Sequence, residues 1–91
     1  MKKTNRASAR KVIFSFHAPD ADEVFIAGTF NDWKPRTDPL KKKATGWSTV
    51  KYLDPGTYEY RFVVDGIWVD DPTCKSRRSN QYGSENCVLE L

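Results

Sequence analysis

The order of hydrophobic and polar residues along this chain follows a period of two over several short stretches, which is typical of half-buried β-strands. The clearest stretch is residues 57–64, where every second residue is aromatic or apolar and would face a core. This period places Arg61 on the opposite face of that strand, where its side chain would point outward from a rigid backbone. Residues 12–16 and 46–53 alternate in a similar way, so we expect two further strands there.

A strand-like apolar run within residues 23–33 ends in a turn that carries Trp33. Its β-branched and aromatic residues favour a pleated, partly buried strand. Gly28 within the run indicates a bulge or a close approach of another backbone. Asn31 and Asp32 bond readily to their own backbone and tolerate turn dihedral angles, so we expect the chain to reverse there. Trp33 is therefore predicted at the edge of a sheet.

Turn residues separate the remaining stretches. Residues 54–56 (DPG) combine the fixed φ of proline with the freedom of glycine, and residues 65–66 (DG) are a strong hairpin signal with Trp68 soon after them. Residues 70–80 are polar and irregular, and residues 87–91 indicate a closing strand. Helical periodicity and internal repeats are both lacking. The 91 residues therefore predict one all-β domain of about six to eight short strands, an immunoglobulin-like β-sandwich.

The formal net charge of +3 originates at one end of the chain. Residues 1–11 hold five basic residues and no acidic one, which leaves ten basic and twelve acidic residues in the remainder. We therefore expect a flexible basic tail at residues 1–11 and a slightly acidic folded module at residues 12–91. The apolar run after the tail is too short for a signal peptide, and no stretch is long enough to span a membrane. We expect a cytoplasmic location.

Cys74, Cys87 and His17 cannot complete a usual structural zinc site without carboxylates, so we expect no metal. In a reducing compartment, two free thiols are expected in preference to a disulfide. His17 has no recognisable nucleophile motif around it and is interpreted as an ordinary surface histidine. The lysine run at residues 41–43 is interpreted as a solvated strand edge that discourages pairing with another sheet.

Three aromatic residues lie at or beside predicted turns, namely Trp33, Trp68 and Tyr82. Hydrogen-bonding side chains accompany them, namely Arg61, Ser84 and Asn86. A sugar chain needs both kinds of group, because the C–H groups of a glucose ring lie flat on an aromatic ring while its hydroxyls need donors and acceptors at the rim. Tryptophan is also a common half-buried sandwich residue, and we expect that structural role for Trp47 at the start of a strand.

Three motifs support the sugar hypothesis: residues 24–33 (VFIAGTFNDW), residues 56–68 (GTYEYRFVVDGIW) and residues 81–86 (QYGSEN), with a DP pair at 71–72 before the last. Together they resemble the glycogen-binding domain of AMP-activated protein kinase β subunits. That domain is a carbohydrate-binding module of family 48, related to the N-terminal domains of branching and debranching enzymes. The resemblance covers residues 12–91. It implies an immunoglobulin-like sandwich of the early-set type that binds α-1,4-linked glucan, as glycogen or starch-like chains, without catalysis or a cofactor.

The resemblance implies specific roles for individual residues. Trp33 and Trp68 match the two stacking tryptophans of the family, and Asn86 matches an asparagine that bonds sugar hydroxyls. Arg61 stands where the kinase module has a lysine that bonds hydroxyls. Ser84 replaces a threonine. Both replacements keep a hydrogen-bond donor.

Two features depart from the family pattern. Tyr82 stands where the kinase module has a leucine inserted against the sugar chain, and a tyrosine at this position offers a third stacking platform. Family members also usually accompany a kinase regulatory subunit or a glucan-processing enzyme. The resemblance therefore implies such a companion, either as a separate partner or as another part of a longer protein.

Other classes of function fit the sequence less well than glucan binding. A protein-docking or regulatory adaptor with a degenerate sugar site would use the basic tail or an edge strand. Single-stranded nucleic acid also stacks on aromatic residues beside Lys and Arg, but the module is slightly acidic outside the tail. Glycoside hydrolysis needs two carboxylates across a cleft, whereas Asp65 is interpreted as a turn residue and Asp70 and Asp71 as a loop. We expect no enzyme activity and no nucleic-acid or membrane partner.

Overall fold

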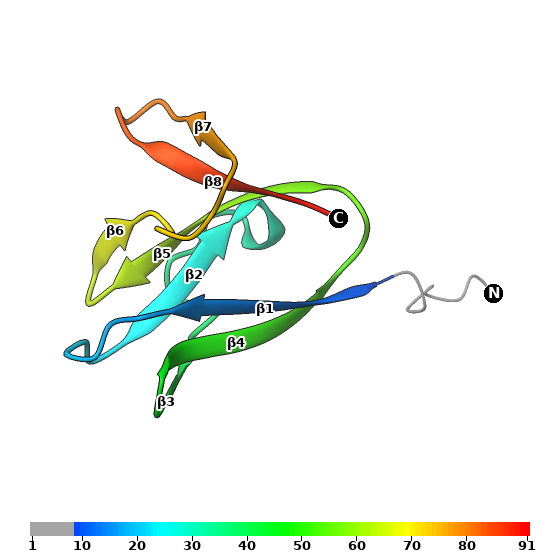
Figure 1. Ribbon diagram of the computed structural model, residues 1–91. Helices are drawn as coiled ribbons and strands as arrows, with labels where there is room; N and C mark the ends of the chain where they lie inside the picture. The colour runs from blue at the N-terminus through cyan, green and yellow to red at the C-terminus, as the bar shows by residue number, and fades with distance from the viewer. Residues whose placement is uncertain (1–8) are drawn as a thin grey trace.

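The computed structural model describes residues 9–91, which form a sandwich of antiparallel β-strands (Figure 1). Apart from one three-residue 3₁₀ helix, the regular elements in this range are all strands, as the alternating pattern predicted. No helix within residues 9–91 is long and apolar enough to cross a membrane. The elements in chain order are β1 (Arg10–Phe16), β2 (Val24–Gly28), η2 (Thr29–Asn31), β3 (Lys41–Lys43), β4 (Gly46–Leu53), β5 (Thr57–Val64), β6 (Ile67–Val69), β7 (Arg77–Ser79) and β8 (Glu85–Glu90).

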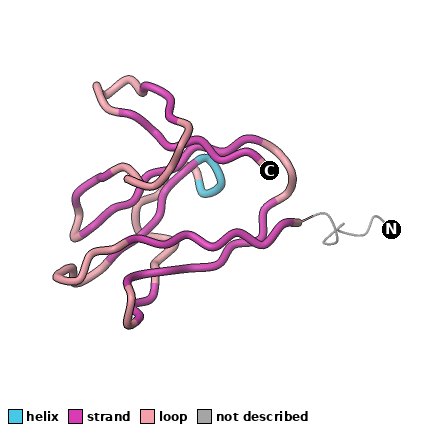
Figure 2. The backbone as a smooth tube through the Cα atoms, in the orientation of Figure 1, coloured by secondary structure: helices cyan, strands magenta, loops and turns pink. Residues whose placement is uncertain are grey.

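The strands form two sheets. One sheet has the order β1-β4-β3, and the other has the order β2-β5-β8-β7, with β6 added beside β5. The predicted turn at residues 54–56 carries the chain from β4 in the first sheet to β5 in the second, along the curved segment at the right of Figure 2. This arrangement confirms the predicted β-sandwich. The lysine run of residues 41–43 forms the edge strand β3, and all three lysines are exposed.

Aromatic side chains from both sheets fill the space between the layers. Phe14 of β1 packs edge-on against Tyr60 of β5 with ring centroids 5.1 Å apart, and Phe16 packs against Phe62 at 4.9 Å. Each such pair contributes about 1 kcal/mol beyond the area it buries, so these contacts hold the sheets together. Trp47 is only 7% exposed, and its indole N–H donates to a backbone carbonyl at 2.9 Å. Trp47 is therefore a core residue, as expected.

One edge of β5 is shared by two strands. The pairing with β8 ends at Tyr60 opposite Cys87, and the pairing with β6 covers Phe62 to Val64. Arg61 lies between the two paired segments and has no strand partner on that edge. β6 stays paired with β5, whereas the β7–β8 hairpin diverges from β5 around this point (Figure 1). We call this point of the second sheet, where the pairing of β5 with β8 ends and its pairing with β6 begins, the fork; Arg61 lies at it.

Two strands differ in extent from the sequence prediction. β1 begins at Arg10, so Arg10 and Lys11 belong to the sheet, while residues 1–8 of the expected tail lie outside the described residues. Residues 77–79 were expected to be irregular, but they form β7 and pair with the first half of β8. All three residues of β7 are polar and exposed, so no alternation of apolar residues marks this strand.

The expectation of two free thiols is wrong, because Cys74 and Cys87 form a disulfide with their Cα atoms 6.0 Å apart. Cys87 is fully buried on β8, and Cys74 lies in the loop before β7. That loop turns back on itself, and the Cys74 amide donates to the Asp71 carbonyl at 3.3 Å. The two cysteines are 13 residues apart in sequence. The β7–β8 hairpin reverses the chain between Cys74 and Cys87 and so brings the two cysteines together.

The two ends of the described chain meet at the turn between β4 and β5. Leu91 and Gly56 exchange backbone hydrogen bonds of 2.9 and 3.2 Å. Arg10 at the start of β1 pairs with Leu53 at the end of β4, just before that turn. The fork at Arg61 lies further along β5, away from this end.

Gly28 allows a close approach between β2 and β5. A Cβ at this position would lie 2.4 Å from the carbonyl oxygen of Glu59 and 2.9 Å from the Tyr60 side chain. Gly28→Ala should therefore lower the free energy of unfolding by about 1–3 kcal/mol, measured by urea denaturation. Ser15→Ala, at an exposed position of β1, should change it by less than about 0.5 kcal/mol. A Gly28→Ala protein as stable as the wild type would contradict this explanation of the glycine.

Candidate functional site

A surface pocket of about 840 Å³ opens at the fork in the second sheet. All six residues singled out from the sequence line it, so the structure brings together side chains that lie far apart along the chain. Two further residues, Asn80 and Gln81, complete the lining. The full lining is Trp33, Arg61, Trp68, Asn80, Gln81, Tyr82, Ser84 and Asn86.

Three parts of the fold contribute to the pocket. Trp33 comes from the turn after η2, and Arg61 and Trp68 come from β5 and β6. The other five residues come from the tip and inner end of the β7–β8 hairpin. The pocket therefore lies between the segments around Trp33, Arg61 and Trp68 on one side and the β7–β8 hairpin on the other.

The two tryptophans form a pair of tilted aromatic surfaces. The ring centroids of Trp33 and Trp68 are 6.5 Å apart, and their planes meet at 43°. Trp68 is 41% exposed and Trp33 is half-buried, so part of each ring is accessible. Trp68 follows the two-residue turn formed by Asp65 and Gly66, both with positive φ, as the DG signal predicted. The angle between the rings suits a ligand that curves rather than a flat one.

The turn that carries Trp33 has an unusual backbone. Asp32 and Trp33 both adopt left-handed conformations, with φ of 57° and 59°, which are uncommon for residues other than glycine. The Trp33 amide donates to the Gly28 carbonyl at 2.9 Å and holds this geometry. Strained backbone of this kind is often found at functional sites, and here it sets the direction of the indole ring.

Asn31 is the centre of the hydrogen bonds that hold this turn. Its Oδ1 accepts from the Gly28 amide at 3.0 Å, and its Nδ2 donates to the Ile26 carbonyl at 3.1 Å. The same Nδ2 donates to Asp38 Oδ2 at 2.6 Å. Lys51 Nζ lies 2.7 Å from Asp38 Oδ1, so the network ends in a partly buried ion pair. The position of Trp33 thus depends on residues from three separate segments.

Asn80 organises the opposite wall of the pocket. Its Nδ2 donates to Ser84 Oγ and to Asn86 Oδ1, both at 2.9 Å. Its Oδ1 accepts from the backbone amides of Tyr82 and Ser84 at 2.9 and 3.2 Å. Sequence analysis missed Asn80. The NQYG sequence of residues 80–83 is a turn signal that would have pointed to this role.

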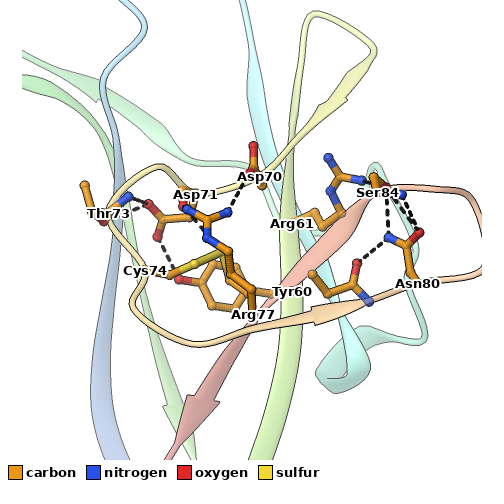
Figure 3. Close-up of polar contacts among 11 residues, drawn as sticks. Tyr60, Arg61, Asp70, Asp71, Thr73, Cys74, Arg77, Asn80 and Ser84 are labelled. Atoms are coloured by element: carbon orange, nitrogen blue, oxygen red, sulfur yellow. Dashed lines mark hydrogen bonds and ion pairs between the residues drawn. A yellow bond between two sulfur atoms is a disulfide. The ribbon is translucent and has the colours of Figure 1, made fainter.

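Arg61 connects β5 to the hairpin. Its Nη1 donates to Ser84 Oγ at 2.5 Å, and its buried Nε has no hydrogen-bond partner (Figure 3). Arg61 is the one charged residue among the described residues that line the pocket. It has no carboxylate partner among them, so the terminal Nη hydrogens that do not bond Ser84 are available to a ligand, whereas the buried Nε is not.

Asn86 is more enclosed than its predicted role suggested. It is 8% exposed, and its Nδ2 donates to Glu59 Oε1 at 3.1 Å while its Oδ1 accepts from Asn80. Glu59 in turn accepts from Arg78 at 2.8 Å. One hydrogen on Nδ2 and one lone pair on Oδ1 remain for a ligand. Asn86 therefore both positions the hairpin and presents part of its amide to the pocket.

Tyr82 is the most exposed aromatic residue of the pocket, at 81%. Its hydroxyl accepts from Gln81 Nε2 at 2.8 Å, which orients the ring. The described lining residues offer three aromatic rings, several amide and hydroxyl groups and one guanidinium, and none of them is acidic. Aromatic faces combined with neutral hydrogen-bonding groups are suited to binding an uncharged polar ligand.

The family of the chain follows from this fold and from its sequence. Residues 10–91 match the family described as the glycogen recognition site of AMP-activated protein kinase, and the chain belongs to that family. The chain is also 43% identical over 69 residues to subunit beta-2 of 5'-AMP-activated protein kinase from Homo sapiens, an alignment that covers 76% of this chain and 25% of the relative. It is 29% identical over 85 residues to subunit beta-1 from Sus scrofa, covering 93% of this chain and 66% of the relative. The chain thus spans about a quarter of the length of the beta-2 subunits it matches.

The network around Asp38 predicts an acid-dependent stability. Burial by itself raises the pKa of Asp38, but hydrogen bonds from Lys51 and Asn31, with the charge of Lys51, together lower that pKa below its ordinary value. A carboxyl whose pKa is lower in the folded state stabilises the fold above its unfolded pKa of about 4. That contribution is lost as the pH falls through the folded pKa. The folded protein should therefore lose this part of its stability below about pH 4.

Asp38→Asn tests this network. The variant should lower the free energy of unfolding at neutral pH by about 1–3 kcal/mol and should lose less stability than the wild type between neutral pH and pH 3, measured by urea denaturation. Glu23→Gln removes an exposed, solvent-screened ion pair with Arg36 and should change the free energy of unfolding less than Asp38→Asn does. Equal acid sensitivity of wild type and Asp38→Asn would show that Asp38 is not the group responsible.

Proposed function

We propose that this chain binds α-1,4-linked glucan, as glycogen or starch-like chains, without catalysing a reaction. The observation that carries the proposal is that one pocket gathers Trp33, Trp68 and Tyr82 with the hydrogen-bonding side chains predicted from the sequence. Membership of a glycogen-recognition family supports the same ligand class. The absence of acidic residues from the described lining supports a binding role over glycoside hydrolysis, which uses a pair of carboxylates.

In this proposal the two tryptophans bind neighbouring glucose units. The C–H groups of each sugar ring would lie on an indole face, where dispersion and aromatic contacts contribute on the order of 1 kcal/mol per ring beyond the area buried. An α-1,4 linkage turns successive glucose units relative to one another. The 43° angle between the planes of Trp33 and Trp68 matches a chain that curves in this way.

Polar groups at the rim would select and orient the sugar hydroxyls. The guanidinium of Arg61 offers free donors, and the amide of Asn86 offers one donor and one acceptor. Ser84 is bonded to both Arg61 and Asn80, so its main contribution would be to hold these groups in place. An uncharged ligand and a largely neutral pocket make binding nearly independent of salt concentration.

Tyr82 would add a third aromatic contact at the outer end of the site. Its high exposure leaves a full ring face for another glucose unit. The affinity for a short oligosaccharide should nevertheless be modest, because Trp68 and Tyr82 stay substantially exposed to solvent. A long polymer offers many overlapping binding positions and would be retained more strongly.

A second candidate function is docking to a partner such as a kinase or a glucan-processing enzyme. Ile13 of β1 lies opposite Val50 of β4, and both are exposed together with Tyr52 on the outer face of the first sheet. These apolar side chains lie on the other layer of the sandwich from the pocket. The two functions are therefore compatible, and Tyr52→Ala would affect docking without altering the pocket.

Trp68→Ala tests the glucan-binding proposal. Loss of one stacking surface should weaken binding of maltoheptaose and of β-cyclodextrin by at least about tenfold, measured by titration of tryptophan fluorescence at low and at high salt. Tyr52→Ala removes an exposed aromatic ring outside the pocket and should leave binding unchanged. No binding by folded wild-type protein, or equal binding by wild type and Trp68→Ala, would overturn the proposal. A steep fall in wild-type binding with salt would instead favour a charged ligand.

A further inference from the structure

The chain segment between the two cysteines supplies more than half of the residues that line the pocket. The segment between Cys74 and Cys87 contains β7, the turn after it and the start of β8. Five of the eight lining residues belong to this segment, namely Asn80, Gln81, Tyr82, Ser84 and Asn86. The disulfide therefore closes into a covalent loop the segment that forms one wall of the site.

Cys87 lies where the hairpin leaves the sheet. β8 pairs with β5 from Glu90 back to Cys87, and no further. The preceding residues of β8, Glu85 and Asn86, pair only with β7. Figure 1 shows the β7–β8 hairpin extending away from β5 beyond this point. Cys87 is thus at the base of the hairpin, directly beside Asn86.

Cys74 belongs to a loop that is fixed to the core. Asp71 in this loop is buried and accepts from the Tyr60 hydroxyl at 2.7 Å, and its other oxygen accepts from the amide and hydroxyl of Thr73 (Figure 3). Arg77 donates to the Asp71 carbonyl at 3.1 Å. The disulfide therefore ties the base of the hairpin to a loop that is held in place by Tyr60 of β5.

The remaining side-chain contacts of the hairpin with β5 are polar and partly exposed. Ser84 accepts from Arg61, and Asn86 donates to Glu59. Arg78 pairs with Glu59, but the Arg78 side chain is 62% exposed. Contacts of this kind are individually weak in water, so the covalent bond is the strongest restraint on the hairpin.

We propose that the Cys74–Cys87 pair controls the pocket through thiol–disulfide exchange. In the disulfide state the hairpin is held in the position that binds ligand. In the dithiol state it moves more freely, and binding must then order it again, which lowers affinity. This inference rests on the glucan-binding function proposed above and adds a redox dependence to the same site.

The exchange needs a dithiol reductant as co-reactant. Cys87 is fully buried and Cys74 is partly exposed, so a thiolate of the reductant attacks Cys74 Sγ and Cys87 leaves as a thiolate that takes up a proton. Cys87 Sγ lies 3.4 Å from the Asp71 carbonyl, which can accept a hydrogen bond from the new thiol. The second thiolate of the reductant then closes its own disulfide and releases Cys74, which also takes up a proton. Two electrons and two protons pass from the dithiol to the protein.

The test compares glucan binding before and after reduction. The sequence contains two cysteines, so the effect of dithiothreitol on the protein reports on this bond alone. Maltoheptaose should bind about three- to tenfold more weakly to the reduced protein than to the oxidised protein. Cys74→Ala/Cys87→Ala should bind like the reduced protein and should not respond to the reductant. Hydrogen exchange should become faster in residues 77–86 and stay unchanged in β1 and β4.

Other results would overturn either the proposed function or the redox control. Failure of the oxidised protein to bind any glucan would overturn the proposed function, whereas equal binding by both forms would overturn only the redox control. Global unfolding on reduction would also overturn the redox control, because the disulfide would then maintain the whole fold rather than the position of the hairpin. Mass spectrometry after treatment with oxidised glutathione should show a disulfide. Two free thiols at that stage would overturn the redox control, because the disulfide would then not form.

Discussion

A strand edge offers one row of backbone donors and acceptors, so each residue of β5 can pair with only one neighbour on that side. β8 occupies the first part of the edge and β6 occupies the last part, and Arg61 lies between them. Both strands run antiparallel to β5, so β6 and β8 follow one another along this edge, and the β7–β8 hairpin separates from β5 beyond Cys87. The space created by this separation is the pocket, and the side chain at the point of divergence is the one cation in its described lining.

The two walls of the pocket are held by different kinds of interaction. Trp33 lies on a tight turn that is fixed by a backbone hydrogen bond to Gly28 and by the amide of Asn31, and Trp68 lies on β6, which pairs with β5. The opposite wall is a hairpin whose shape is set from within by Asn80. A rigid aromatic surface facing a separately organised hairpin allows the site to combine a fixed stacking geometry with an adjustable set of hydrogen bonds.

The sequence predicted those features that depend on local chemistry. The period of two identified β5 and the outward direction of Arg61, and the DG pair identified the turn before Trp68. β7 was not predicted, because a strand that is polar and exposed on every side chain shows no alternation. The disulfide was not predicted, because the proximity of Cys74 and Cys87 depends on the path of a hairpin that no local pattern describes. The role of Asn80 depends on contacts with Ser84 and Asn86, which form only when the turn closes.

The pairing of Leu91 with Gly56 and of Arg10 with Leu53 defines one end of the module, which we call a pole, and the opposite end is a second pole. Both described chain ends lie at one pole, while β6 and the tip of the β7–β8 hairpin lie toward the other (Figure 1). The described chain ends therefore lie away from the pocket. In the glucan-binding proposal, a ligand as large as a polysaccharide particle would therefore meet β6 and the tip of the β7–β8 hairpin without contacting the described chain ends.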